Sequence, residues 1–214
     1  MGITAIAIIV ALILSIVLHE VAHGYAANWL GDPTARLAGR LTLNPLSHID
    51  PMGSIIVPAL LFLTHAGILF GWAKPVPYNP YNLNNQKWGD AIVAAAGPCT
   101  NLLLAVVFAL LIRASVLLGL SPSFVQLASY IVFINVLLAF FNLIPFPPLD
   151  GSKILESFLP PSARMQFRHF ASLTERFGLV ATFIFIFIFV TIFWGPFSSL
   201  VGAIFTLLTG ITFL

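Results

Sequence analysis

Residues 3–23 read ITAIAIIVALILSIVLHEVAH, in which an unbroken apolar run from Ile3 to Val17 leads directly into His19 and Glu20. A helix needs about 20 mostly apolar residues to cross the ~30 Å hydrocarbon core of a membrane. The run therefore predicts a membrane-spanning helix over about residues 3–30 that carries polar side chains within its length. A cleaved signal peptide is disfavoured, because no basic residue precedes the run and no small-residue cleavage site follows it.

The composition of the whole chain also indicates a membrane protein. Of its 214 residues, 59% are hydrophobic and 7% are charged, whereas a soluble domain carries about 25% charged residues. With 9 Lys and Arg against 7 Asp and Glu, the chain lacks the basic face of a nucleic-acid-binding protein, so no nucleic-acid partner is expected. Its single cysteine, Cys99, excludes an internal disulfide framework. A protein embedded in the lipid bilayer is the class that remains.

Five more apolar stretches follow the first, separated by polar or proline-broken connectors. The six stretches lie at about residues 3–30, 53–71, 91–118, 125–146, 177–194 and 197–213. They predict an all-α polytopic membrane protein with five or six transmembrane helices, depending on whether 53–71 spans the membrane or re-enters it. A turn at Gly195-Pro196 is expected to separate the last two helices. No connector is long enough for a second soluble domain, so residues 1–214 are expected to form one membrane-embedded domain.

Three ionisable residues stand together in the first stretch, as His19-Glu20-Val21-Ala22-His23. Ionisable groups inside the membrane are costly, so they indicate a functional site. Residues four apart on a helix lie on one face, and the H-E-x-x-H pattern can therefore direct both imidazoles at one metal ion. Glu20 projects beside them, where it can take a proton from a water molecule bound to the metal. The alternative is that His19 and His23 are packed histidines and the match is accidental.

A catalytic zinc usually has three protein ligands, so a third must come from elsewhere in the chain. The candidates near or inside apolar stretches are His48, Asp50, His65, Asp90 and Asp150. The run from Asn142 to Gly151, NLIPFPPLDG, is the most unusual of their surroundings, because its three prolines cannot continue a helix. Broken backbone at membrane depth is tolerated only where it lines a cavity or is buried in protein. This run therefore predicts that Asn142 and Asp150 lie at a polar pocket.

Three ordered motifs resemble the signatures of the site-2 protease family, the intramembrane zinc metalloproteases of peptidase family M50. They are His19 to His23, the GPCTN element of residues 97–101, and the Asn142-to-Gly151 run. The segment FGWAKPVPYNP of residues 70–80 is similar to the compact prokaryotic branch of the family, which lacks PDZ and CBS domains. The resemblance covers most of residues 15 to 155. Three motifs in this order are far more specific than H-E-x-x-H alone.

The resemblance implies a role for each matching residue. His19, His23 and Asp150 would be the ligands of one Zn²⁺ per chain, and Glu20 the general base. Asn142 matches a position that holds substrate or stabilises the oxyanion, and Asn101 matches a conserved polar position that is a second candidate for this role. Ser152 departs from the family, which often has a second glycine there, and it is not expected to disturb the metal site.

The family also implies a fold and a substrate class. Three core helices, at about 3–30, 91–118 and 125–146, would carry the active site, and 177–194 and 197–213 would be accessory helices. The substrates would be transmembrane proteins, cut in or near their membrane-spanning segments as in regulated intramembrane proteolysis. The rival interpretation is a non-catalytic metal-binding carrier or protease-like scaffold, for which an intact Glu20 is not needed. The oligomeric state is not predicted.

The basic residues indicate how the chain sits in the cell membrane. If 53–71 spans, they divide six to three between the two faces; if it re-enters, eight lie on one face and only Arg113 on the other. Because Lys and Arg are enriched in cytoplasmic connectors, the second arrangement is favoured. It also places His23 and Asp150 toward the same face. The expected topology has the N-terminus outside, with the active site and the C-terminus toward the cytoplasm.

Overall fold

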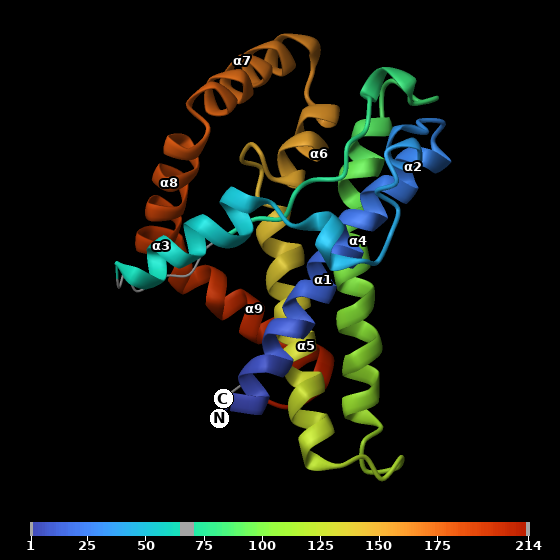
Figure 1. Cartoon of the computed structure of the whole chain (residues 1–214), viewed down its shortest axis with the longest axis vertical. Coiled ribbons are helices and arrows are strands. Elements are labelled where there is room, and N and C mark those ends of the chain that lie inside the picture. The colour runs from blue at the N-terminus through green and yellow to red at the C-terminus, as the bar shows by residue number, and fades with distance from the viewer. Residues whose placement is uncertain (1, 65–70, 213–214) are drawn as a thin grey trace.

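The computed structural model describes residues 2–64 and 71–212, and every regular element within them is helical (Figure 1). Four described stretches are long and apolar enough to cross a membrane. They are Ala5–Trp29 within α1 (Gly2–Trp29), α4 (Gly89–Arg113), α5 (Pro122–Asn142) and Leu179–Thr209. The predicted all-α polytopic class is confirmed, and the chain is a multi-pass membrane protein.

Helices α1, α4 and α5 form the centre of the molecule, with α4 and α5 side by side as an antiparallel pair (Figure 1). Small residues on α4 and α5, among them Ala105, Ala109 and Ala128, are buried where these helices meet. In lipid, small side chains at an interface allow two helix backbones to approach closely. The α-helices at Gly2–Trp29, Gly89–Arg113 and Pro122–Asn142 match the three predicted core ranges apart from their ends.

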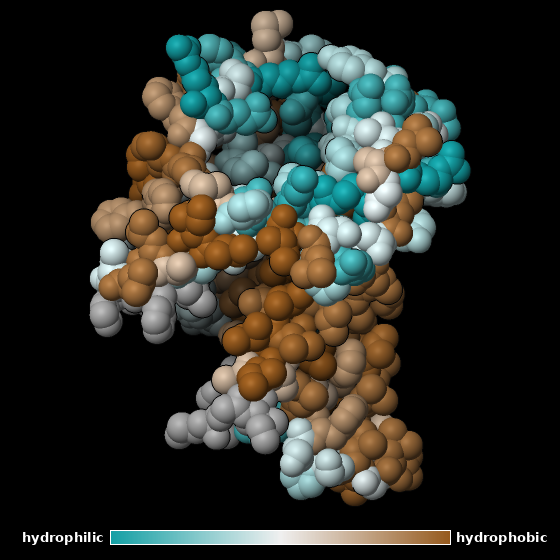
Figure 2. Space-filling model, viewed as in Figure 1, coloured by the Kyte–Doolittle hydropathy of each residue, from teal (hydrophilic) through white to brown (hydrophobic). Residues whose placement is uncertain are grey.

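The outside of the helices is apolar, and the polar residues gather at one end. In Figure 2 brown side chains cover the lower part of the visible face, whereas teal ones lie at the upper end, which Figure 1 assigns to α2 (Thr34–Leu37), α6 (Asp150–Phe158) and α7 (Pro161–Phe177). Large apolar side chains such as Ile9, Leu103 and Leu110 are exposed along the helices. An apolar exterior of this kind suits a lipid environment.

The two ends of the segment over residues 51–72 lie close together. The segment begins as η2 (Pro51–Ile56) and α3 (Val57–Leu63). Its two ends are joined, because Trp72 N donates to Gly53 O at 3.1 Å and Lys74 N donates to His48 O at 2.9 Å. A straight helix over residues 53–71 would separate its ends by about 27 Å, so these bonds exclude a single crossing. The two ends of the segment thus lie side by side, as the re-entrant alternative requires.

The C-terminal region forms one long bent helical path instead of two helices. α8 (Leu179–Ile188) continues through η4 (Phe189–Phe193), which has π-helical hydrogen bonding, into α9 (Trp194–Thr209). Together they are the fourth candidate span. The expected Gly195-Pro196 turn is wrong, because both residues lie within α9. The described residues thus contain four candidate spans, where five or six were expected.

This fourth crossing changes the expected position of the C-terminus. Arg113 at the end of α4 donates through Nε to Leu208 O at 2.6 Å and through Nη2 to Leu207 O at 2.7 Å. The end of α9 therefore lies beside the end of α4, at the opposite end of the molecule from α6 and α7 (Figure 1). The expectation that the C-terminus shares the side of the active site is wrong, since an even number of crossings returns the chain to the side on which it began.

Candidate metal centre

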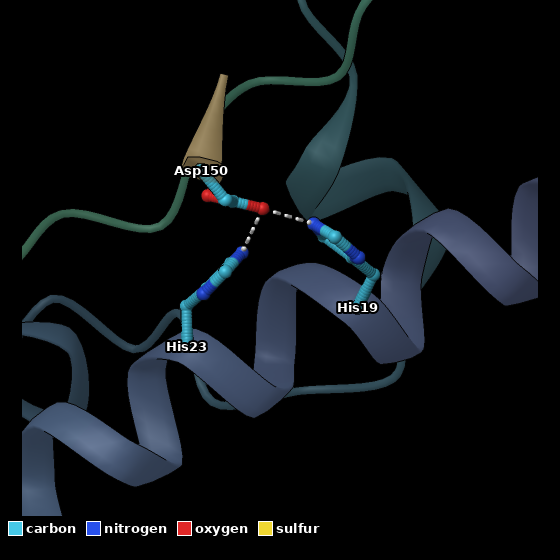
Figure 3. A group of neighbouring side chains, drawn as sticks. All are labelled: His19, His23 and Asp150. Atoms are coloured by element: carbon cyan, nitrogen blue, oxygen red, sulfur yellow. Dashed lines mark hydrogen bonds and ion pairs between the residues drawn. The ribbon is translucent and has the colours of Figure 1, made fainter. Parts of the chain in front are cut away.

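His19 and His23 lie one turn apart on α1 and point to the same side of the helix (Figure 3). Their ring centroids are 4.6 Å apart with the ring planes nearly perpendicular, and both side chains are buried. Ten residues separate His19 from Trp29 at the end of the helix, which corresponds to about 15 Å along the axis. His23 lies six residues from Trp29, or about 9 Å, so both imidazoles lie within the helix and away from its end.

Asp150 comes to the two histidines from the other side, as the first residue of α6 (Figure 3). Its Oδ2 atom lies 3.1 Å from His19 Nε2 and 3.4 Å from His23 Nε2. Zinc bound at about 2.0–2.1 Å by each of two tetrahedral ligands separates them by about 3.3 Å, so both distances fit edges of such a tetrahedron. Within residues 2–64 and 71–212, this is the only group of three His, Cys, Asp or Glu residues whose ligand atoms converge in this way.

The broken run between α5 and α6 carries Asp150 to this position. Gly151 packs directly on the backbone carbonyl of Leu143, so closely that a side chain at residue 151 would collide with it. Ser152 donates to Leu149 O from both its backbone nitrogen, at 3.0 Å, and its hydroxyl, at 2.7 Å. The serine that departs from the family pattern therefore stabilises the start of α6.

Gly97 of α4 provides the space between the two rings. A Cβ atom built on this glycine would lie 2.5 Å from His23 Nε2 and 2.6 Å from His19 Nε2. The absence of a side chain at residue 97 thus leaves a hollow in front of both nitrogen atoms, bordered by Asp150. A metal ion held by two imidazoles and one carboxylate fits this hollow and this donor set.

The far nitrogen of each imidazole is engaged by the protein. His23 Nδ1 lies 2.7 Å from Val93 O, and His19 Nδ1 lies 2.5 Å from Asn101 Oδ1. A backbone carbonyl can only accept, so His23 Nδ1 carries a hydrogen, and Nε2 is the nitrogen left to bind a metal beside Asp150. Histidines that bind metals through one nitrogen usually donate the other to such a partner.

Glu20 lies at the rim of the same face of α1, partly exposed. Its Oε2 accepts a hydrogen bond of 3.0 Å from the backbone N–H of Val76. Val76 belongs to the extended chain that crosses α1 after the re-entrant segment, and its side chain fills the space left by Gly24, where a Cβ would be 2.8 Å from Val76 Cγ1. One oxygen of the Glu20 carboxylate is therefore held in place by the extended chain.

Asp32, just beyond the end of α1, anchors the same extended chain. Its carboxylate is fully buried and accepts from Asn79 N at 2.6 Å, Asn82 Nδ2 at 2.9 Å and the Thr34 hydroxyl at 2.5 Å. Burial alone would raise the pKa of Asp32, but the hydrogen bonds from Thr34, Asn82 and Asn79 outweigh it and lower the pKa below its usual value. Glu20 and Asp32 thus tie the chain to α1 at two points.

Three of the other candidate ligands, His48, Asp50 and Asp90, do not converge on this centre. His48 Nε2 lies 2.9 Å from Thr42 O, and Asp50 Oδ1 caps η2 by accepting from Gly53 N at 2.7 Å. Asp90 lies in the first turn of α4. His65 lies outside the described residues. Asp50 therefore caps a helix, and His48 forms a hydrogen bond within its own loop.

The two predicted asparagines occupy different places. Asn142 ends α5, is partly exposed, and donates from Nδ2 to Leu138 O at 3.0 Å. Asn101 is fully buried behind His19, on the opposite side of its ring from Asp150. Sequence reasoning missed Asn135, whose side chain donates to Ser15 and contacts Asn101. The only available signal was an amide in the middle of an apolar helix.

Comparisons with known proteins show the family to which the chain belongs. Peptidase family M50 matches residues 7–122 and 118–186, so the chain belongs to this family. No solved structure matches the chain.

Two kinds of bacterial relative illustrate the similarity. A Bacillus subtilis protein provisionally named zinc metalloprotease YwhC is 37% identical over 190 residues, which are 86% of this chain and 80% of the relative. Proteins provisionally named zinc metalloprotease Rip2 are 34% identical over 167 residues in Mycolicibacterium smegmatis and 30% over 160 residues in Mycobacterium tuberculosis. These alignments cover 74% and 73% of this chain but 60% and 59% of the relatives, respectively.

Proposed function

We propose that the chain is a zinc-dependent intramembrane endopeptidase of the site-2 type, with residues 1–214 forming one peptidase domain. Its membership of peptidase family M50 and the names of its relatives support this function. The observation that carries it is the convergence of His19, His23 and Asp150 at the helix that also carries Glu20, with the two histidines about 9 to 15 Å from the end of this apolar helix. Ionisable groups at such a depth are costly unless they have a function.

The roles follow from the geometry. His19, His23 and Asp150 hold one zinc ion, which when bound supplies a Lewis acid for the scissile carbonyl and acidifies a water molecule. Glu20 accepts the proton of the attacking water and passes it to the leaving amine, so that water and a peptide bond become a carboxylate and an amine. The hydrogen bond from Val76 N keeps the Glu20 side chain in place for both transfers. Asn142, partly exposed at the end of α5, is the candidate to hold the substrate or its oxyanion.

The substrates are segments of other membrane proteins that cross or border the lipid bilayer. In a helix each peptide carbonyl is hydrogen-bonded within the helix, so the substrate must unwind locally before Glu20 and the metal centre can act on it. Water reaches the site from the polar end that α6 and α7 form, since the side chains between this end and the lower tip are mostly apolar on the face that Figure 2 shows. The site therefore favours unwound segments near this end of the membrane.

The polar end faces the cytoplasm in the topology that we propose. Eight of the nine Lys and Arg residues lie in the elements and connectors of this end, and Arg113 lies at the other. Because positively charged connectors stay on the cytoplasmic side, the chain places its metal centre toward the cytoplasm and both ends outside, in the cell membrane.

The substitution Glu20→Gln tests the function against the rival of a non-catalytic carrier or scaffold. The amide keeps the size of the side chain but cannot accept the water proton, so the variant should bind one zinc per chain and lose at least about 100-fold in cleavage rate. Cleavage of a transmembrane substrate by the purified full chain is measured in detergent, with Glu175→Gln on the exposed face of α7 as the matched control. A Glu20→Gln variant that cuts as fast as wild type refutes the proposed function.

A further inference from the structure

A column of three buried polar side chains stands behind His19, one from each central helix. Ser15 of α1, Asn101 of α4 and Asn135 of α5 are 3%, 0% and 0% exposed. Each lies among apolar residues of the helix core, where a polar group without a hydrogen-bond partner is costly. The three side chains form one hydrogen-bond network that ends at His19 of the metal centre.

The deep end of the network has a fixed orientation. Asn135 Nδ2 lies 2.8 Å from Ile131 O and 2.9 Å from Ser15 Oγ. The carbonyl of Ile131 can only accept, so the nitrogen of the Asn135 amide must be on this side. The oxygen of the same amide consequently faces Asn101, and Asn135 Oδ1 accepts from Asn101 Nδ2 at 2.7 Å.

The orientation passes on to Asn101. Its Nδ2 atom is directed at Asn135 Oδ1 and at a second acceptor, Ser15 O at 3.5 Å. With its nitrogen held there, Asn101 can only present its oxygen to His19, whose Nδ1 lies 2.5 Å away. An amide oxygen does not donate, so the hydrogen of this bond belongs to His19 Nδ1.

His19 therefore carries a hydrogen on Nδ1, which leaves Nε2 as the nitrogen that can bind a metal beside Asp150. His23 reaches the same state directly, through the carbonyl of Val93. The partner of His19 Nδ1 is instead the side-chain amide of Asn101, which can rotate so that its nitrogen and oxygen exchange places. Its oxygen faces the imidazole only while something else engages its nitrogen.

We propose that Asn135 is a positioning residue of the metal centre, which holds the Asn101 amide in the orientation that makes His19 Nε2 a zinc ligand. This inference rests on the proposed zinc site and adds a residue that touches neither metal nor substrate. Loss of the Asn135 oxygen frees the Asn101 amide to turn, and its nitrogen would then favour the His19 tautomer that cannot bind the metal. Mutating the residues that hydrogen-bond to metal-bound histidines typically lowers metal affinity by about 10- to 100-fold.

The substitution Asn135→Leu removes the amide at similar size, and Asn135→Asp keeps an oxygen that can accept from Asn101 Nδ2. The control is Val132→Ala, on the same helix and fully buried, which opens a cavity in the apolar core without touching the network. Full-length protein in detergent is stripped of metal, and its zinc affinity is measured by competition with a coloured chelator. The visible spectrum of bound Co²⁺ reports the ligand set, and the melting temperature of the metal-free protein reports stability.

We expect Asn135→Leu to weaken zinc binding by about tenfold or more and to change the Co²⁺ spectrum, whereas Asn135→Asp stays closer to wild type. Val132→Ala should lower the melting temperature and leave zinc affinity unchanged. Wild-type zinc affinity in Asn135→Leu overturns the proposal, and so does an equal loss in Val132→Ala, because the effect would then come from packing.

The same measurements separate this proposal from the proposed function. A wild-type chain that binds zinc and cleaves nothing refutes the peptidase function but leaves the role of Asn135 to be decided by zinc affinity. A wild-type chain that cleaves its substrate, with unchanged zinc affinity in Asn135→Leu, refutes only the role of Asn135. A wild-type chain that binds no zinc overturns both.

Discussion

Replacing Gly97 by alanine should remove zinc binding while leaving the helix that carries it intact. The added Cβ would lie 2.5 Å from His23 Nε2 and 2.6 Å from His19 Nε2, and real Cβ contacts essentially never fall below 3.0 Å. At least one ring must therefore move by about 0.5 Å, whereas ligand distances in a metal site hold to about 0.2 Å. Both rings are also restrained through Nδ1, by Asn101 and Val93.

We expect a loss of zinc affinity of at least about 100-fold, equivalent to about 2.7 kcal/mol. The helix itself should not be weakened, because alanine is favoured over glycine in a helix by about 1 kcal/mol. A zinc ion that binds only the folded protein stabilises it, and the stabilisation grows with the affinity. The variant should therefore lose the rise in melting temperature that zinc gives the wild type.

The assay is zinc content per chain together with chelator competition, followed by melting curves with and without zinc. Gly202→Ala is the matched control, since Gly202 lies within α9 and a Cβ there meets nothing within 4 Å. The control should bind zinc as wild type does. If Gly97→Ala retains wild-type zinc affinity, the hollow in front of the two histidines does not hold the metal and the reasoning from close approach fails.

Two further predictions concern the connectors. Cysteines placed singly at Asp50 and Lys74, in a chain with Cys99 replaced by serine, should react with a membrane-impermeant thiol reagent from the same side of sealed vesicles; labelling from opposite sides would contradict the re-entrant segment. Asp32→Asn should destabilise the chain at neutral pH, and the difference in melting temperature from wild type should shrink on acidification below about pH 4. The direction of this change follows from the lowered pKa of Asp32. Its stabilisation is present above the pKa of the unfolded state and is lost as the pH falls through the lower pKa of the folded state. A difference in melting temperature that grows in acid would contradict this prediction.

The local part of the site was predictable from sequence alone. His19 and His23 are four residues apart, and any α-helix through them brings their imidazoles to one face. Apolar length likewise predicted α1, α4 and α5, because crossing a membrane demands about 20 apolar residues whatever the neighbouring helices are. The NLIPFPPLDG run at residues 142–151 marked Asp150 as unusual, although its distance from the histidines depends on how α6 packs.

Errors and omissions arose where hydropathy is ambiguous. Apolar residues 53–71 and 177–213 satisfy the same hydropathy test as the core helices, yet the first segment turns back and the second makes one bent crossing. The choice depends on hydrogen bonds between distant residues, such as Trp72 N to Gly53 O, and on the π-helical η4. The hydrophobic periodicity of the sequence predicts neither these hydrogen bonds nor the π-helical segment.

Metal-site chemistry therefore divides into two parts. The residue types, their helical spacing and the scarcity of charge, with 7% of residues charged, were enough to identify the ligands and the base as candidates. Folding alone brought Gly97, Asn101 and Asn135 to the two histidines from helices α4 and α5. The physical reason is that ligand identity depends on functional groups and local spacing, whereas ring orientation, tautomer and the space for a metal depend on atoms that are far apart in the chain and meet only when the helices pack.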